Sequence, residues 1–138
     1  MAAAHFTLPF EVRDYECDLQ GIVNNAVYLQ YLEHTRHQFL KRHGIHFAEL
    51  SRAGVNLVVV RAEIDYKAPL RSGEAFLVAL TIEQLSPVTF GFRQDIHRVG
   101  GPAPPLIVRA RVVCAAMDRA GKPVRPTVLE PLFEQFRL

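Results

Sequence analysis

The chain has 138 residues, of which 49% are hydrophobic and 22% charged, a balance that excludes disordered and collagen-like proteins. This length suits one domain, residues 1–138, with a single core. Sixteen basic and fourteen acidic residues give a formal charge of +2, too small to favour a nucleic acid partner. The sequence shows no signal-peptide pattern and no stretch near the ~20 apolar residues of a membrane span, so we expect a cytoplasmic protein.

The first elements expected along the chain are a short strand and a long helix. The strand lies in FTLPFEV, and the helix covers residues 25–43. Asn24 is a favourable N-cap and Gly44 a favourable stop signal. The helix has one broad apolar face, which predicts that it packs on a core. This face holds Tyr28, Leu29, Tyr31, Leu32, Thr35, Phe39 and Leu40, and Gln30, His34, His37 and Lys41 lie opposite.

After a possible short helical turn in HFAELSRAG, the hydrophobic period changes to two. Four further strands are expected, in NLVVVRAEIDYKAPL, EAFLVALTIEQL, VTFGFRQDIHRV and LIVRARVVCAAMD. The connections between them are short and carry Gly or Pro, so the strands should run largely antiparallel. The strand in NLVVVRAEIDYKAPL is expected to place Val58, Val60, Ala62, Ile64 and Tyr66 on one face. A sheet with one apolar face needs a cover, and the helix provides it, so the fold class is α+β.

A candidate site lies just before the long helix, in YECDLQGIVNNAV. Asp18 precedes Asn25 by seven residues, and Gly21 permits a tight turn between them. The start of a helix has free N–H groups and partial positive charge, which stabilise an oxyanion. A carboxylate beside such donors is an arrangement that hydrolysis of an acyl group needs. An acid before a helix is also a common capping or turn residue, and that structural interpretation stays open.

These residues resemble the 4-hydroxybenzoyl-CoA thioesterase family of hotdog-fold acyl-CoA thioesterases. The family motif Tyr-x-x-(Thr/Cys)-Asp-x-x-Gly-x-Val is matched from Cys17 onward in YECDLQGIV, with Cys17 at the Thr/Cys position and Tyr15 one residue nearer to it than the motif's Tyr. The segments LEHTR, YKAPLRSGE and AAMDRAGKPVRP extend the resemblance over residues 8–126. The variant VNNAVYLQYLEHTRHQFL is most similar to the branch with plant and cyanobacterial acyl-lipid and 1,4-dihydroxy-2-naphthoyl-CoA thioesterases.

The resemblance implies a hotdog fold, in which five or more antiparallel strands wrap one long central helix. It makes Asp18 the catalytic carboxylate, on the turn that Gly21 permits, and the backbone N–H of Asn25 the oxyanion donor. Many relatives carry His or Tyr at the position of Asn25, so only the backbone role is carried over. Tyr15, Asn24 and Tyr28 are the implied substrate-binding residues.

The expected function is hydrolysis of an acyl-CoA, or of an acyl-carrier-protein thioester, to the free acid and thiol. No metal or cofactor is implied beyond the CoA of the substrate. The resemblance further implies a homodimer with active sites at the interface, paired again to a homotetramer. The alternative is a hotdog module that binds acyl-CoA without turning it over. Asp18 argues against this, because pure binding does not need a carboxylate near a thioester.

Other reactive side chains receive structural interpretations. Glu33 and Arg36, one helical turn apart, are expected to form an ion pair. His34 and His37 have the spacing of metal ligands but lack a third ligand, so solvated histidines are favoured. Cys17 and Cys114 are expected to be reduced, and packing is a commoner role for Cys17 than nucleophilic attack.

Overall fold

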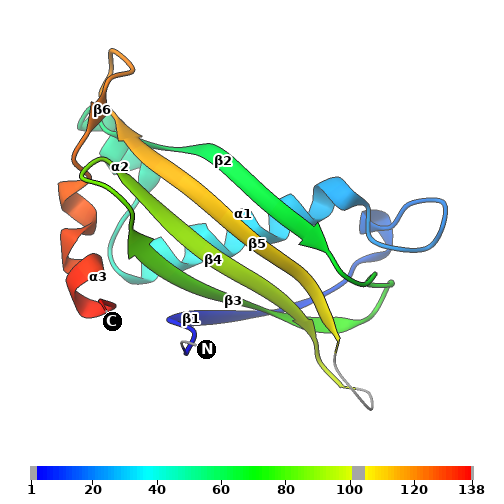
Figure 1. The fold of residues 1–138 in the computed structure, drawn as a ribbon. Helices are drawn as coiled ribbons and strands as arrows, with labels where there is room; N and C mark the ends of the chain where they lie inside the picture. Colours follow the sequence, from blue (N-terminus) through cyan, green and yellow to red (C-terminus); the bar gives the residue numbers. More distant parts are fainter. Residues whose placement is uncertain (1–2, 101–104, 138) are drawn as a thin grey trace.

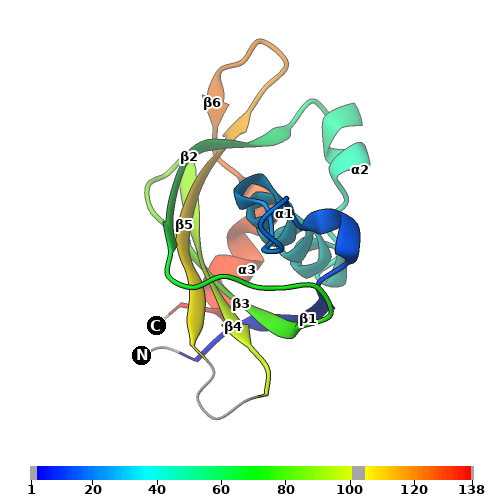
Figure 2. The ribbon, with the colours of Figure 1, turned by 90° about the vertical axis from the view of Figure 1, so that its right-hand side faces the viewer.

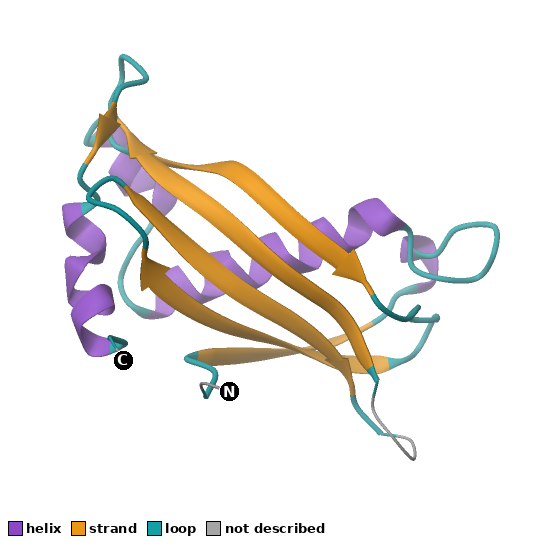
Figure 3. Ribbon diagram, viewed as in Figure 1, coloured by secondary structure: helices purple, strands orange, loops and turns teal. Residues whose placement is uncertain are grey.

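An antiparallel sheet curved around one long helix makes up most of the structure. The computed structural model describes residues 3–100 and 105–137. The helices, drawn in purple in Figure 3, are α1 (Asn25–Arg42), α2 (Phe47–Arg52) and α3 (Glu130–Gln135), with 3-10 turns η1 (Asp14–Glu16) and η2 (Thr127–Leu129). The strands are β1 (Phe6–Glu11), β2 (Asn56–Tyr66), β3 (Ala75–Gln84), β4 (Thr89–Arg98), β5 (Leu106–Met117) and β6 (Pro123–Val124).

The sheet has the strand order β1-β3-β4-β5-β2, and β6 adds to β5. Every pairing is antiparallel. Figure 2 shows that the sheet curves around α1 and that α2 lies on the opposite side of α1 from β2. The predicted α+β class, with an antiparallel sheet wrapped around one long helix, is confirmed.

Helix α1 begins and ends where the sequence predicts, to within one residue. The Asn24 side chain accepts a hydrogen bond from the Ala26 N–H at 3.0 Å, as an N-cap does. Gly44 follows the last turn with φ of 78°, a left-handed conformation that suits glycine. Leu29 was expected on the buried face but is 44% exposed, because it lies at the margin of the apolar stripe. The remaining predicted members are buried: Tyr28, Tyr31, Leu32, Thr35, Phe39 and Leu40.

Two apolar clusters fill the space between α1 and the sheet, one near each end of the helix. Between them lies a polar pair: Arg36 on α1 donates from Nη1 to Oε1 of Gln94 on β4 at 3.0 Å. The Gln94 amide in turn donates to the Leu32 carbonyl at 2.9 Å. The predicted ion pair between Glu33 and Arg36 is therefore wrong, because Glu33 stays exposed while Arg36 turns into the core.

Strand β2 departs from its predicted pattern. Val60, Ala62 and Tyr66 were expected on an inner face, yet all three are exposed. A register shift between Val59 and Arg61 interrupts the alternation, and β2 lies at the edge of the sheet, where cover is incomplete. The strand therefore exposes apolar side chains along a free edge.

Candidate active site

Asp18 begins a tight turn whose geometry is well defined. Its carbonyl accepts from the Gly21 N–H at 3.0 Å, and its N–H donates to the Ile22 carbonyl at 2.9 Å. Its carboxylate accepts from the Gln20 N–H at 2.8 Å. Gly21 has φ of 80°, which explains why this position needs glycine. The Asp18 side chain is exposed in the single chain.

The same turn occurs a second time, at the far end of the sheet. The Asp118 carbonyl accepts from the Gly121 N–H at 3.0 Å, and the Asp118 carboxylate accepts from the Ala120 N–H at 2.9 Å. Gly121 also has φ of 80°. The turn geometry by itself is therefore structural. What distinguishes Asp18 from Asp118 is the segment to which each turn is attached.

The Asp18 turn is attached to the start of α1. Cys17 bridges Val23 across the turn, and the Glu16 carbonyl accepts from the Asn24 N–H at 3.0 Å. The Val23 N–H also donates to the Leu70 carbonyl at 2.9 Å, which ties the segment to the corner between β2 and β3. In Figure 1 this loop, in blue, projects beyond the first residues of α1. The carboxylate and the helix start thus share one small hydrogen-bonded frame.

The first turn of α1 has a free amide. The Ala26 N–H donates to the Asn24 side chain and the Val27 N–H to the Asn24 carbonyl. Among the residues that the structure describes, none accepts a hydrogen bond from the Asn25 N–H. The Asn25 carbonyl, in the next peptide unit, accepts from the Tyr66 hydroxyl at 3.2 Å, so Tyr66 contacts this first turn of the helix. The Asn25 N–H is therefore an available donor at the positive end of the helix.

The tyrosines predicted to bind substrate lie in different surroundings. Tyr15 is 80% exposed, on the same projecting loop as Asp18. Tyr28 is buried, and its hydroxyl accepts from the Leu70 N–H at 3.1 Å. Burial raises the pKa of Tyr28, so its hydroxyl stays protonated. The structure thus brings Asp18, Gly21, Asn24 and Asn25 together through the main chain, while Tyr28 supports the frame from the core side.

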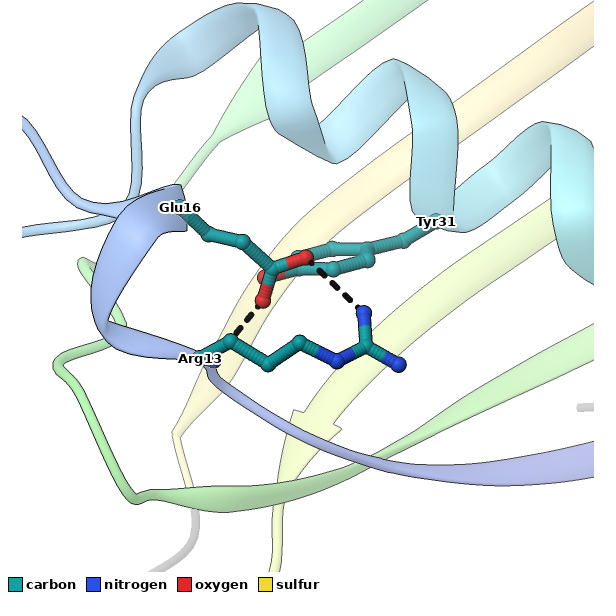
Figure 4. Close-up of polar contacts among 3 residues, drawn as sticks. All are labelled: Arg13, Glu16 and Tyr31. Carbon is teal, nitrogen blue, oxygen red and sulfur yellow. Dashed lines mark hydrogen bonds and ion pairs between the residues drawn. The ribbon is translucent and has the colours of Figure 1, made fainter.

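Sequence reasoning missed Glu16, which lies two residues before Asp18. Its carboxylate is buried and contacts Arg13 and the hydroxyl of Tyr31 (Figure 4). Burial and the hydrogen bond to Glu16 raise the pKa of Tyr31 well above its usual value, so the hydroxyl donates. In the sequence, the only feature that marks Glu16 is its place between two other acids, Asp14 and Asp18. Acids grouped in this way are ordinarily expected to be exposed to solvent.

Two clefts lie away from the Asp18 turn. One of about 780 Å³ runs between β1 and α1 and is lined by Glu16, Tyr31 and His34. The other, of about 1240 Å³, lies over the outer face of the sheet and is lined by charged residues such as Arg93 and Arg111. Neither cleft includes Asp18 or Asn25. The carboxylate and the free amide are therefore not enclosed by one chain.

The histidines and cysteines have structural surroundings. The His34 ring meets Phe10 edge-on at 5.9 Å. Across residues 3–100 and 105–137, no three His, Cys, Asp or Glu side chains are placed to hold a metal ion. Both cysteines are free thiols; burial raises the pKa of Cys114 to about 11.

None of the described helices is both long and apolar enough to cross a membrane.

Comparison with solved structures identifies the fold. A 1,4-dihydroxy-2-naphthoyl-CoA thioesterase from Synechocystis superposes with a TM-score of 0.88 at 24% identity, over 96% of this chain and 98% of that one. The Dynemicin thioesterase superposes with a TM-score of 0.84 at 27% identity, over 94% of this chain and 95% of that one. The predicted hotdog architecture is confirmed.

Sequence comparison identifies the family. The model of the thioesterase-like superfamily matches residues 12–132. A chloroplastic acyl-acyl carrier protein thioesterase of Arabidopsis thaliana is 37% identical over 131 residues, which are 94% of this chain and 69% of the relative. The chain thus spans about two thirds of the length of the plant relatives it matches. It belongs to the thioesterase-like superfamily, and the predicted enzyme class, thioesterase, is confirmed.

Proposed function

We propose that this thioesterase hydrolyses an acyl-CoA to the free acid and CoA, with Asp18 as the reacting carboxylate and the Asn25 N–H as oxyanion donor. The observation that carries the proposal is that the turn holding the Asp18 carboxylate is hydrogen-bonded to the start of α1. At this start the Ala26 N–H is capped by Asn24, and the Asn25 N–H is free. A donor at this position stabilises negative charge as it develops on the carbonyl oxygen of the thioester. The Gly21 turn holds the carboxylate on this loop.

Two routes are compatible with these groups. In the first, an Asp18 oxygen attacks the thioester carbonyl, the C–S bond breaks, the thiolate takes a proton from water, and a second water hydrolyses the mixed anhydride. In the second, Asp18 takes a proton from a water that attacks directly, and the C–S bond breaks in the same way. In a single turnover in ¹⁸O-water, the first route places label in Asp18 when the second water attacks the Asp18 carbonyl of the anhydride and in the acid product when it attacks the acyl carbonyl, so label in Asp18 is diagnostic of the first route. The second places label only in the acid product.

We further propose that a second copy of the chain encloses the site. Asp18 is exposed in one chain, and Leu19 beside it is fully exposed. Strand β2 presents an unpaired edge with exposed aliphatic residues, and Tyr66 at its end bonds to Asn25. Pairing of two β2 edges would satisfy this edge and close the sites between the subunits. Pairing of two such dimers to a tetramer stays a prediction from the resemblance.

The acyl group and its carrier are the next question. The plant relatives are named for acyl carrier protein substrates, and the Synechocystis structure for an aromatic CoA thioester. An acyl-carrier-protein thioester is therefore the second candidate substrate for this chain. A panel of aromatic, medium-chain and β-ketoacyl thioesters on both carriers, assayed by thiol release, separates these classes. We propose no metal and no cofactor.

The deciding experiment compares Asp18→Asn with Asp118→Asn. Both carboxylates accept from the N–H two residues on, and Asp118 also accepts from the Lys122 N–H at 2.9 Å; an asparagine oxygen can still accept these bonds, so both variants should fold. We expect kcat to fall about 10²- to 10⁴-fold in Asp18→Asn alone. Full activity in Asp18→Asn would refute the catalytic role. If the wild-type protein bound acyl-CoA tightly and hydrolysed it no faster than buffer, the non-catalytic binding module would be the correct alternative.

A further inference from the structure

Glu16 bonds Arg13 at the start of its own 3-10 turn and also reaches Tyr31 and Asn24 of the long helix and its cap. Its Oε1 accepts from the Arg13 N–H at 2.8 Å and from the Tyr31 hydroxyl at 2.9 Å. Its Oε2 lies 3.3 Å from Arg13 Nη1. Its carbonyl accepts from the Asn24 N–H at 3.0 Å. One residue therefore bonds Arg13 at the start of η1, the body of α1, and the cap of α1. Figure 4 shows Glu16 between Arg13 and Tyr31.

The side chain of Glu16 is almost fully enclosed, with 8% of it exposed. A carboxylate is buried only where donors satisfy its oxygens, because removing it from water costs several kcal/mol otherwise. Here two donors converge on one oxygen, and hydrogen bonds to a charged acceptor are stronger than neutral ones. The orientation of Glu16 relative to Tyr31 is therefore tightly determined.

The position of Glu16 in the chain links this orientation to the reacting groups. Asp18 follows by two residues, and the intervening Cys17 bridges Val23. On the other side, the Asn24 N–H bonded to Glu16 belongs to the residue directly before Asn25. A rotation of Glu16 would move the Asp18 turn and the free amide relative to each other. The bonds of the Asp18 carboxylate itself are local and exposed, as they are at Asp118, while Val23 and Ile22 tie the far end of the loop to Leu70 and Arg71.

We infer that Glu16 is a positioning residue, which holds the Asp18 carboxylate and the Asn25 amide in register by clamping their loop to Tyr31 of α1. This inference rests on the function proposed for Asp18 and Asn25. Glu16 contacts no reacting atom; it acts through the placement of its neighbours. A displacement of about 1 Å at a reacting group can lower a rate about 10²-fold, so the clamp affects turnover more than substrate binding.

The test uses Glu16→Ala, Glu16→Gln and Tyr31→Phe in the full chain, assayed with the best thioester of the panel well below each melting temperature. Glu16→Ala removes all side-chain bonds and keeps the carbonyl, so we expect kcat to fall about 10- to 100-fold with KM within about twofold. Glu16→Gln retains an oxygen acceptor, and its kcat should lie within about threefold of wild type. Tyr31→Phe removes one donor and should lower kcat about threefold to tenfold. Glu11→Ala, an exposed acid on the neighbouring strand, is the matched control.

Amide hydrogen exchange gives a second measurement that does not depend on turnover. Glu16→Ala should raise exchange in the peptide spanning residues 17–25, while strands β4 and β5 keep their protection. An unchanged kcat in a folded Glu16→Ala would overturn the inference, and so would unchanged exchange in the peptide spanning residues 17–25 of that variant. If Glu16→Ala does not fold, Tyr31→Phe decides by the same two measurements.

Failure of the proposed function gives a different result. If Asp18→Asn retains full activity, the catalytic assignment of Asp18 is wrong, whatever Glu16 does. If Asp18→Asn is inactive while a folded Glu16→Ala retains its kcat, only the positioning role is wrong. If the wild type hydrolyses no thioester, the exchange measurement alone decides whether Glu16 clamps the loop.

Discussion

The Arg36 guanidinium and the Gln94 amide form the polar link between α1 and the centre of the sheet. Their 3.0 Å hydrogen bond lies between two apolar clusters, and both residues are buried. Burial lowers the pKa of Arg36, since desolvation disfavours its charged form. No carboxylate lies within ion-pair distance of Arg36 in the described part of the chain. The glutamine oxygen is thus its main compensating partner.

Removal of that partner should destabilise the fold. We expect Gln94→Leu to lower the free energy of unfolding by roughly 3 kcal/mol, because a buried charge loses its acceptor. The double variant Gln94→Leu with Arg36→Met should recover most of the loss, since it replaces both groups by apolar ones. Urea unfolding at one fixed protein concentration measures both. Equal loss in the single and double variants would show that the pair is not the cause.

The oxyanion role of Asn25 belongs to its backbone, and proline tests this directly. Proline removes the N–H, is tolerated at the first position of a helix, and suits the extended conformation of Asn24 before it, with φ of −61° and ψ of 137°. We expect Asn25→Pro to lower kcat about 10²- to 10³-fold and Asn25→Ala, which keeps the N–H, to change it little. Circular dichroism should show an intact helix in both. An equally large loss in Asn25→Ala would assign the role to the side chain instead.

A charge on the free edge of β2 should separate the subunits. Val60 is 52% exposed on this edge, so Val60→Lys would bring a positive charge from each subunit to the paired edge. Sedimentation should show a smaller species for Val60→Lys with an unchanged sheet signal, and thioesterase activity should fall with it. Val128→Lys, on η2 away from this edge, serves as control. A wild-type protein that sediments as a monomer at assay concentration, yet is fully active, would contradict the shared site.

Protonation of His5 should lower the stability of the fold below neutral pH. The Ile82 N–H donates to His5 Nδ1 at 3.1 Å, and the ring stacks on Phe136 at 4.3 Å. Burial lowers the pKa of His5 from its usual 6.5, so the folded state prefers the neutral ring that can accept this bond. The unfolded chain therefore takes up the proton first, and stability present above about pH 6.5 is lost as the pH falls through the lowered folded pKa.

Melting temperatures between pH 8 and pH 5 test this dependence. The decline should be shallower in His5→Ala than in the wild type. His37 has a pKa lowered by burial as well and acts with the same sign, so His37→Ala should also make the decline shallower. Parallel curves for the wild type and His5→Ala would exclude a contribution from His5.

The sequence by itself determined the elements with strong periodicity and clear end signals. Asn24 and Gly44 mark the two ends of a helix that carries three to four apolar residues on one face in every two turns. The ends of α1 in the structure agree with this prediction to within one residue. Strands β3 and β4 largely alternate buried and less buried residues, as their period of two predicts, and β5 does so from Val108 to Val112; all three lie inside the sheet, paired on both sides. The Asp18 turn also followed from local rules, since Gly21 adopts the left-handed conformation that only glycine takes readily.

Tertiary structure decided the features that depend on neighbours distant in the chain. Helical spacing favours Glu33 as the partner of Arg36, but the sheet supplies Gln94 at the point where the buried guanidinium ends. Strand β2 alternates like its neighbours, yet its edge position leaves Val60 and Tyr66 exposed. The buried contacts of Glu16 likewise require Tyr31, fifteen residues away, to fold back on it. Local periodicity reports which face of an element is apolar, whereas burial, partners and the frame of a site arise only when the elements pack.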